Sequence, residues 1–254
     1  MQLIVVVLAR RGANSCYNSV GMLVIVDGID GSGKRTIVEI MKAFLEEKGR
    51  KSFDIGEWSK VHQALPEWND MAGCDLVIGA EPSYVWAGAA VRYEMVRNNR
   101  GYSLRDIAQG FAIDRLTLYR RCYLPMLERG AWVINERGVS ASIVYQPAAD
   151  PTLSLEEVIG MGGNALALEH APDHLVIASL DAKIAMERLA KRLNKQDDHI
   201  FEKEAFSRTL DERFKSDWFR QLFESRGTKL HFIDTSGSLE QTKQQTITLL
   251  ESLV

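Results

Sequence analysis

The segment GIDGSGKRT, residues 28–36, has glycines and a lysine at a spacing that can hold the phosphates of a nucleotide. It matches the pattern Gly-x-x-x-x-Gly-Lys, in which inward-pointing backbone N–H groups and the start of a helix surround the phosphates. The next position normally has a hydroxyl that ligates Mg²⁺, but here it is Arg35. The segment therefore predicts a nucleotide site and leaves open whether that site transfers phosphate. The predicted ATP-binding residues in it are Gly28, Ile29, Asp30, Gly31, Ser32, Gly33, Lys34, Arg35 and Thr36.

A second pair of candidate residues, Glu136 and Arg137, follows the apolar run AWVIN. A phosphate loop needs an acid for its metal ion at the end of a neighbouring strand, and an arginine can neutralise a phosphate through two parallel hydrogen bonds. Strand ends face the ligand cleft in parallel α/β proteins, so we predict a metal role for Glu136 and a phosphate role for Arg137. On an open surface the same two residues would form only an ion pair.

Strands and helices alternate along the chain after Met22, and this alternation predicts the frame that holds the candidate residues. Apolar runs predict buried strands, and KSFDIGEW and DLVIGAEP predict two more. The pattern predicts an α/β fold with a central, mostly parallel sheet, helices on both faces and ligands at the carboxyl ends of the strands. The apolar runs are residues 23–27, 131–135, 174–180 and 229–235, and helices are expected at 34–48, from a capping box at Ser103 to near Pro125, around Ser140, from Asp181 to about Leu193, and after a capping box at Ser238.

Composition bounds the class of protein. The 254 residues are 46% hydrophobic and 26% charged, which suits a globular chain with a real core. The net charge of −3 and the lack of long single-sign runs predict no nucleic-acid partner and no membrane partner. The three cysteines, Cys16, Cys74 and Cys122, have no metal-binding spacing, and we expect reduced thiols that only pack.

The first 21 residues differ from the rest. The run LIVVVLA is far shorter than a membrane span, and its positive charges follow it, whereas a signal peptide has them in front. We predict that residues 1–21 are an N-terminal extension and that residues 22–254 form a single domain. The alternative is that LIVVVLA adds an edge strand to the sheet.

Several ordered motifs resemble those of the thymidylate kinases, P-loop enzymes that phosphorylate dTMP with ATP. VDGIDGSGKRT resembles their phosphate loop, FAIDR their base-binding helix, and PMLERGAWVINERGVSASIVYQ their helix, strand and Asp-Arg-Tyr stretch. EPSYVWAGAAVR resembles their Glu-Pro-Gly-Gly segment, and APDHLVIASLD their Pro-Asp strand. The resemblance covers most of the chain from Leu23 to Val254. It implies a P-loop kinase with a helical lid, conversion of dTMP to dTDP with ATP and Mg²⁺ for dTTP synthesis, a homodimer and a cytoplasmic location.

The resemblance also implies roles for single residues. Phe111 would stack on thymine, and Arg115, one helical turn later, would hydrogen-bond the base. Arg137 would hold the acceptor phosphate, while Ser142 and Tyr145 would face the base and the sugar 2′ position. The full predicted substrate-binding set is Glu81, Arg92, Phe111, Arg115, Arg137, Ser142 and Tyr145; the metal set, acting through water, is Asp30 and Glu136; and the catalytic set is Lys34, Asp30, Glu136, Arg137 and Arg192.

The catalytic arginine is expected in a lid at about residues 188–204. Some kinases of this family carry that arginine in the phosphate loop, but this loop has Gly31 there. A basic stripe at helical spacing begins with Arg188, which we also predict to bind ATP, and Arg192 is the first candidate for catalysis. A solvated basic face is the alternative. The stripe comprises Arg188, Lys191, Arg192 and Lys195.

The sequence also departs from the family, and these departures keep two alternatives open. Residues 59–74 are an insertion of unknown purpose. A deoxynucleoside kinase would phosphorylate a 5′-hydroxyl with Glu81 as its base, and a nucleotide-binding protein that has lost catalysis would explain the altered residues directly. The altered positions are Arg35 in place of a hydroxyl, Ala80 in place of arginine, Ser83 and Tyr84 in place of two glycines, Glu136 in place of aspartate, and Gly138 in place of an aromatic residue.

Overall fold

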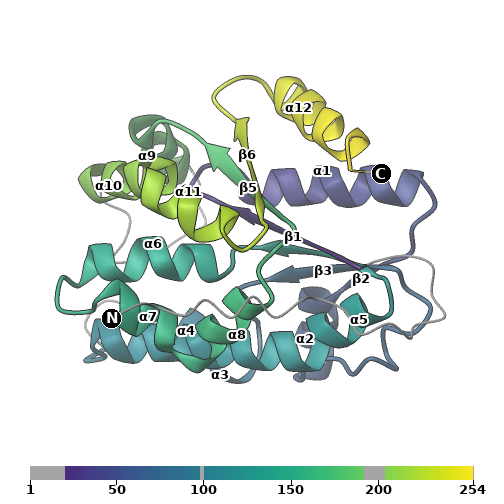
Figure 1. The fold of residues 1–254 in the computed structure, drawn as a ribbon, viewed down its shortest axis with the longest axis horizontal. Coiled ribbons are helices and arrows are strands. Elements are labelled where there is room, and N and C mark those ends of the chain that lie inside the picture. Colours follow the sequence, from purple (N-terminus) through teal and green to yellow (C-terminus); the bar gives the residue numbers. More distant parts are fainter. Residues whose placement is uncertain (1–20, 98–99, 192–203, 254) are drawn as a thin grey trace.

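A single sheet of six strands forms the centre of the molecule (Figure 1). The computed structural model describes residues 21–97, 100–191 and 204–253. The strand order is β2-β3-β4-β1-β5-β6, and every pair within the sheet is parallel, which confirms the predicted α/β class. The strands are β1 (Met22–Asp27), β2 (Ser52–Asp54), β3 (Leu76–Ala80), β4 (Trp132–Glu136), β5 (His174–Ser179) and β6 (Lys229–Asp234).

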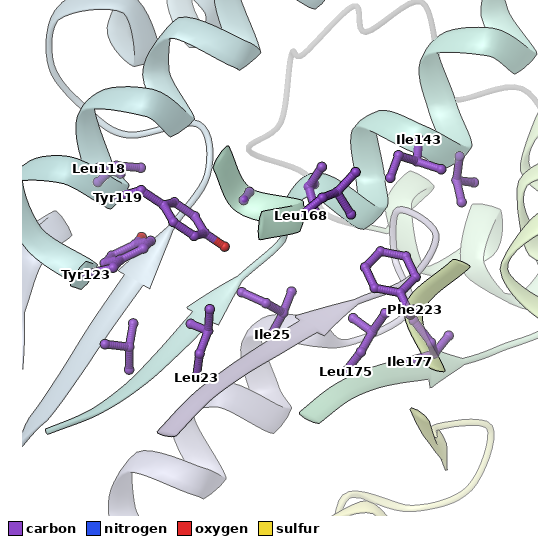
Figure 2. Close-up of a cluster of buried hydrophobic side chains, with 14 of the residues drawn as sticks. Leu23, Ile25, Leu118, Tyr119, Tyr123, Ile143, Leu168, Leu175, Ile177 and Phe223 are labelled. Carbon is purple, nitrogen blue, oxygen red and sulfur yellow. The ribbon is translucent and has the colours of Figure 1, made fainter. Parts of the chain in front are cut away.

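Helices cover both faces of this sheet, and β1 shows why. Its side chains alternate, so that Leu23 and Ile25 enter one core and Val24 and Val26 the other. The second core lies under α1 (Lys34–Glu47) and α12 (Leu239–Glu251), and the first, larger core lies against most of the remaining helices (Figure 2). Those helices include α3 (Trp86–Ala90), α4 (Leu104–Leu118), α5 (Leu124–Glu128), α6 (Val139–Ala149), α7 (Leu155–Gly160), α8 (Gly162–Glu169), α9 (Ala182–Ala190), α10 (Glu204–Lys215) and α11 (Asp217–Glu224), with π-helical turns at Val91–Met95 and Tyr119–Tyr123.

The predicted helix starts are confirmed by their caps. The Ser103 hydroxyl accepts from the Asp106 N–H in a full capping box before α4, and Ser238 does the same for α12. Asp181 accepts from the first N–H groups of α9. Near Pro125 the long helix does change, because a π-helical turn at Tyr119–Tyr123 leads into α5.

The segment KSFDIGEW is only in part a strand. β2 ends at Asp54, whose carboxylate accepts from the Glu57 N–H and starts helix α2 (Ile55–His62). This local cap overrides the apolar pattern that predicted a longer strand. The predicted insertion at 59–74 therefore begins inside a helix, and it is anchored to the core by buried Leu65 and Met71.

The predicted N-terminal extension, and with it the alternative edge strand, lies outside the described residues, as do residues 192–203 of the predicted lid. Within the part of the chain that the structure describes, no helix combines the length and the apolar character that a membrane span requires.

Candidate active site

A cavity of about 530 Å³ opens at the carboxyl ends of β1, β3 and β4. Its walls come from the phosphate loop, the segment after β3, α4, the segment after β4, and α6. Most predicted site residues line it, although Gly28, Ile29, Ser32 and Arg188 do not, and Arg192 lies outside the described residues. The lining members of the predicted set are Asp30, Gly31, Gly33, Lys34, Arg35, Thr36, Glu81, Arg92, Phe111, Arg115, Glu136, Arg137, Ser142 and Tyr145.

The phosphate loop already holds its lysine in place. The Lys34 ammonium group donates to the carbonyl oxygens of Gly28 (3.0 Å) and Ile29 (2.7 Å) and lies 3.8 Å from the Asp30 carboxylate. Burial, together with the positive charge of Arg137, lowers the pKa of Lys34 to about 8. The amine is therefore fixed at the base of the loop, and an anionic phosphate would favour its charged form.

Close packing of the loop against α9 requires one of its glycines. Gly31 has φ +82°, and a Cβ there would lie 2.6 Å from the Ala185 carbonyl oxygen. Arg188 on the same helix donates to the Thr235 carbonyl (2.7 Å), and the Thr235 hydroxyl donates to the Ser32 carbonyl (2.8 Å). The predicted ATP-binding Arg188 thus contacts a direct neighbour of the loop, and its role in binding ATP stays a prediction.

Arg35, the residue that departs from the loop pattern, is directed along the outside of α1. Its guanidinium lies 2.9 Å from the Glu39 carboxylate, and about half of its side chain, 52%, is exposed. One helical turn separates the two residues, which is the ordinary spacing for such a pair. The charge of Arg35 is therefore balanced locally.

Arg137 is held by three neighbours at the edge of the cavity. It forms an ion pair with Asp30, and its guanidinium lies 5.7 Å from the centre of the Tyr145 ring. Its backbone has φ +68°, an unfavourable conformation for a residue with a side chain, and its N–H donates to the Val26 carbonyl (2.8 Å). This bond across β1 and β4 fixes the strained turn that aims the guanidinium into the cavity.

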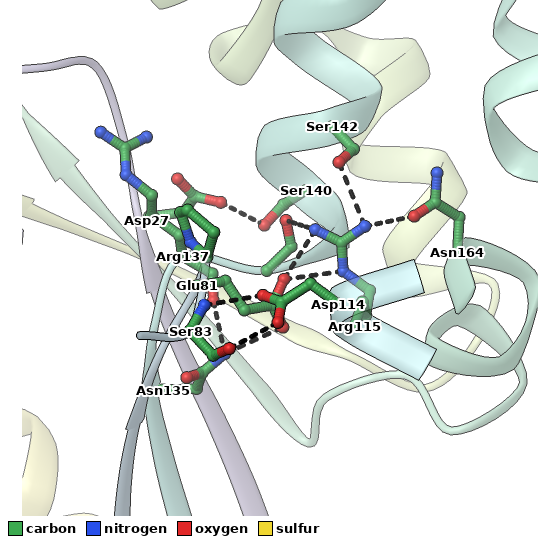
Figure 3. Close-up of polar contacts among 12 residues, drawn as sticks. Asp27, Glu81, Ser83, Asp114, Arg115, Asn135, Arg137, Ser140, Ser142 and Asn164 are labelled. Carbon is green, nitrogen blue, oxygen red and sulfur yellow. Dashed lines mark hydrogen bonds and ion pairs between the residues drawn. The ribbon is translucent and has the colours of Figure 1, made fainter. Parts of the chain in front are cut away.

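Glu81 and Arg115, which both line the cavity, form a buried ion pair (Figure 3). Arg115 Nε donates to Glu81 Oε2 (2.8 Å), and Asn135 donates to Glu81 Oε1 (3.2 Å). The remaining guanidinium donors reach Ser142 Oγ (3.1 Å), the Gly138 carbonyl (3.0 Å) and the amide oxygen of Asn164. Burial raises the pKa of Glu81 to about 7, and Arg115 opposes that rise.

This network affects two predicted roles, that of Arg115 in binding a base and that of Glu81 as a catalytic base. A guanidinium has five N–H donors, and all those of Arg115 are occupied by protein groups. To bind a base directly, Arg115 would have to exchange one of these partners, so that role stays a prediction. Glu81 accepts on both oxygens, so serving as a base for a 5′-hydroxyl would mean separating it from Arg115.

Gln146 is a cavity residue that the sequence reasoning missed. It is 6% exposed, its amide nitrogen donates to Ser142 Oγ (3.2 Å), and its amide oxygen has no hydrogen-bond partner among the described residues. A buried oxygen without a hydrogen-bond donor costs free energy, and an N–H group of a ligand could satisfy it. The signal was present in the sequence, since Gln146 lies one turn after Ser142 on α6 and would share its face.

Two buried aspartates, also missed, fix the backbone around the cavity. Asp27 accepts from the Gly28 N–H (2.9 Å) and from the Ser140 hydroxyl (2.6 Å), which ties the phosphate loop to α6. Asp114 accepts from both the backbone N–H (2.7 Å) and the hydroxyl (2.6 Å) of Ser83. Asp114 is the acid of the FAIDR motif, so the sequence contained this signal as well.

The predicted insertion contacts a residue of the cavity wall, Tyr84, through Lys60. Tyr84, in place of a family glycine, lines the cavity together with Ala80 and Arg92. The Lys60 ammonium of α2 lies 4.4 Å from the centre of the Tyr84 ring, and the Arg92 guanidinium lies 4.3 Å from it. Ala80 stands where the family has an arginine, and this part of the wall therefore has two other cations, Lys60 and Arg92, beside Tyr84.

The residues present fit a magnesium ion that arrives with a nucleotide. Two carboxylates, Asp30 and Glu136, line the cavity next to Lys34, and carboxylate oxygen is a preferred ligand of Mg²⁺. Over the described ranges 21–97, 100–191 and 204–253, no three His, Cys, Asp or Glu side chains form a cluster that could hold a metal alone. Mg²⁺ commonly keeps several waters and binds through one or two carboxylates plus substrate phosphates, which this donor set allows.

Comparisons with known proteins agree with the motifs. The family model for thymidylate kinase matches residues 59–246, a range that begins after the phosphate loop. A thymidylate kinase of Thermosipho africanus is 28% identical over 187 residues, which cover 72% of this chain and 80% of that protein. A thymidylate kinase of Bifidobacterium longum subsp. infantis is 26% identical over 87% of this chain and 82% of its own length. A probable thymidylate kinase of Thermococcus kodakarensis is 25% identical over 92% of this chain and 98% of its own length.

Proposed function

The chain belongs to the thymidylate kinase family, and from that premise we propose that it transfers the γ-phosphoryl group of ATP to dTMP, giving ADP and dTDP. The observation that carries the proposal is one cavity whose lining combines two chemically different groups of residues. The cations Lys34 and Arg137 suit phosphates, and half-buried Phe111 and the amide of Gln146 suit a base.

The part of the cavity wall that contains Phe111 and Gln146 suits a thymine base. Phe111 packs against Val91, Val96 and Ile107, which hold its ring at the wall. A flat aromatic surface can stack on a base. The Gln146 amide oxygen is buried and unpaired in this structure, and a turn of the amide toward the cavity would let it accept from the N3–H of thymine. Cytosine has an acceptor at N3, so the same oxygen would disfavour it.

Tyr145 suits the sugar of a deoxynucleotide. It is buried against Arg137, and its hydroxyl donates to the Gly28 carbonyl at the edge of the phosphate loop (3.4 Å). With dTMP bound as proposed, the Tyr145 ring would lie beside the sugar, where it would exclude a 2′-hydroxyl by contact. The selection of deoxyribose is part of the proposal.

Transfer at this site rests on positioning and on charge. Phosphoryl transfer passes through a transition state whose charge lies mainly on phosphate oxygens, so fixed cations supply most of the catalysis. Lys34 neutralises the outer phosphates of ATP and Arg137 the acceptor phosphate, and their neighbours fix both side chains. Mg²⁺, held through water by Asp30 and Glu136, would add further neutralising charge.

Three parts of the proposal rest on the family resemblance. They are a lid that contributes Arg192 or Arg188, a homodimer, and a cytoplasmic step in dTTP synthesis. ATP use follows from the family, and the Mg²⁺ dependence is part of what we propose.

A panel of acceptors tests the function. The purified chain, with ATP and Mg²⁺, is assayed against dTMP, dUMP, thymidine and no acceptor. We expect dTMP to be the best acceptor. Faster turnover of thymidine would identify a deoxynucleoside kinase, and ATP binding without turnover of any acceptor would identify a nucleotide-binding protein without catalysis.

A further inference from the structure

Helix α6 carries three predicted or observed cavity residues, Ser142, Tyr145 and Gln146, and it also contains Pro147. In an α-helix the carbonyl of residue i accepts from the N–H of residue i+4. Proline has no N–H, so Pro147 leaves the Ile143 carbonyl without its helical donor. The gap lies in the same turn that presents Tyr145 and Gln146 to the cavity.

An arginine from another helix occupies this gap. Arg213 of α10 donates through Nη2 to the Ile143 carbonyl (3.4 Å) and through Nε to the Val144 carbonyl (3.0 Å). The two helices pack together in the fold (Figure 1). Arg213 is half-buried, and burial lowers its pKa, while its guanidinium lies 5.0 Å from the centre of the Trp218 ring.

The same helix also packs on the sugar end of the cavity. The Phe214 and Phe206 rings of α10 each lie edge-on to the Tyr145 ring, with 6.4 Å between ring centres. Tyr145 is therefore fixed from one side by α10 and from the other by Arg137. A shift of α6 relative to α10 would move Tyr145 and Gln146 together.

We propose that Arg213 is a positioning residue for the acceptor site: it caps the Ile143 carbonyl that Pro147 leaves open, together with the neighbouring Val144 carbonyl, and so holds the cavity-facing turn of α6. The inference rests on the proposed function, since it concerns the acceptor nucleotide. It predicts that Arg213 and Pro147 act as a pair, because the arginine is needed only where the helix lacks a donor.

The test is a double-mutant cycle of Arg213→Met and Pro147→Ala. Methionine keeps the packing on Trp218 and removes the donors, and we expect the KM for dTMP to rise about tenfold, within the range of coupled contacts, with little change in the KM for ATP. Alanine at 147 restores an N–H for Ile143, so the double variant should return close to the KM of Pro147→Ala alone. The matched control is Arg220→Met, which removes an exposed arginine near the Phe232 ring and should change neither KM.

A second measurement does not depend on the substrate. Amide hydrogen exchange in α6 should accelerate in Arg213→Met and slow again in the double variant. Arg213→Lys, which offers donors from a single atom, should give a smaller effect in the same direction and serves if the methionine variant does not fold. An unchanged KM in Arg213→Met, or a raised KM that Pro147→Ala does not reverse, overturns the inference. A wild-type chain without dTMP turnover overturns the proposed function instead, and α6 exchange then still decides the role of Arg213.

Discussion

At the scale of single residues, the ammonium group of Lys34 is the clearest link between structure and chemistry. It is buried, it is bonded to carbonyls of its own loop, and its pKa is lowered to about 8 by burial and by Arg137. A depressed pKa means that the charged form is lost in the free enzyme as the pH rises through about 8. An ATP phosphate bound beside the amine would bring negative charge to it and restore that form.

We therefore expect kcat/KM for ATP, which reports the free enzyme, to fall above about pH 8, while kcat falls only at higher pH. Lys34→Ala should remove most of the activity at every pH and leave the fold intact. Lys48→Ala, which removes an exposed lysine near the Phe44 ring of the same helix, is the matched control. Turnover of Lys34→Ala within about tenfold of wild type, or 1.4 kcal/mol, would contradict the phosphate-loop assignment.

Arg35 gives a second prediction at this scale. Its guanidinium pairs with Glu39 on the outer side of α1, so it does not replace the missing hydroxyl ligand. Arg35→Ser should keep the activity within about tenfold and lower the Mg²⁺ concentration that gives half of the maximal rate. Glu136→Ala should cost far more, because it removes one of the two carboxylates, Asp30 and Glu136, that are assigned to Mg²⁺. The rates of both variants, measured as a function of Mg²⁺ concentration, test this assignment of the metal site. An inactive Arg35→Ser together with an active Glu136→Ala would contradict it.

Gln146 gives a third prediction at the scale of single residues. If its unpaired amide oxygen accepts from the base, Gln146→Leu should raise the KM for dTMP by about tenfold or more, since a buried hydrogen bond to a ligand is worth roughly 1–3 kcal/mol. The KM for ATP should stay the same. Gln244→Leu, on the exposed face of α12, is the control and should change neither value. Equal KM values for dTMP in the two variants would show that the amide does not contact the base.

At the scale of elements, β1 needs no strand before it. Its neighbours in the sheet are β4 and β5, both from later in the chain, and its first residue, Met22, donates to the Ala131 carbonyl (3.3 Å). Both hydrogen-bonding edges of β1 are thus occupied within the described chain. An N-terminal extension could pair only elsewhere.

Deletion of residues 1–21 should therefore leave the activity and the melting temperature nearly unchanged. The comparison is between the full chain and a chain that begins at Met22, by thermal unfolding and by turnover of dTMP. A large loss of soluble protein would show instead that LIVVVLA contributes to the sheet.

At the scale of the whole molecule, a histidine pair on two neighbouring strands makes the free energy of unfolding depend on pH. His174 Nδ1 of β5 and His231 Nε2 of β6 are 2.9 Å apart. Burial and the neighbouring His231 lower the pKa of His174 from 6.5 to about 4, and burial lowers that of His231. A depressed folded-state pKa gives stability that is present above the unfolded value of about 6.5 and is lost as the pH falls toward 4.

The melting temperature of the wild type should accordingly fall more between pH 6.5 and pH 4 than that of His174→Phe, which cannot gain a proton there. Phenylalanine suits a buried strand position and keeps much of the volume. Glu81 works in the opposite direction, because its raised pKa favours the folded state at low pH, and it is common to both proteins. Parallel pH curves for the two chains would show that the histidine pair does not couple to folding.

The sequence by itself determined most of the frame and the phosphate end of the site. Buried parallel strands are continuous apolar runs, and helix caps are local, so β1, β4, β5 and the starts of α4 and α12 follow from short stretches of chain. The phosphate loop is equally local, since its glycines, lysine and helix start are consecutive. Local signals also mislead where they compete, as at Asp54, whose cap ended a strand predicted to be longer.

Only the tertiary structure decided which distant side chains meet. The buried pair of Glu81 and Arg115 joins the end of β3 to α4, and the donors of Arg115 are occupied while the buried amide oxygen of Gln146 has no partner among the described residues. Arg213 meets the carbonyls near Pro147 across about 70 residues of chain, which no spacing rule could indicate. Such contacts depend on how whole helices pack, because a side chain satisfies whichever buried polar groups the fold brings within its reach.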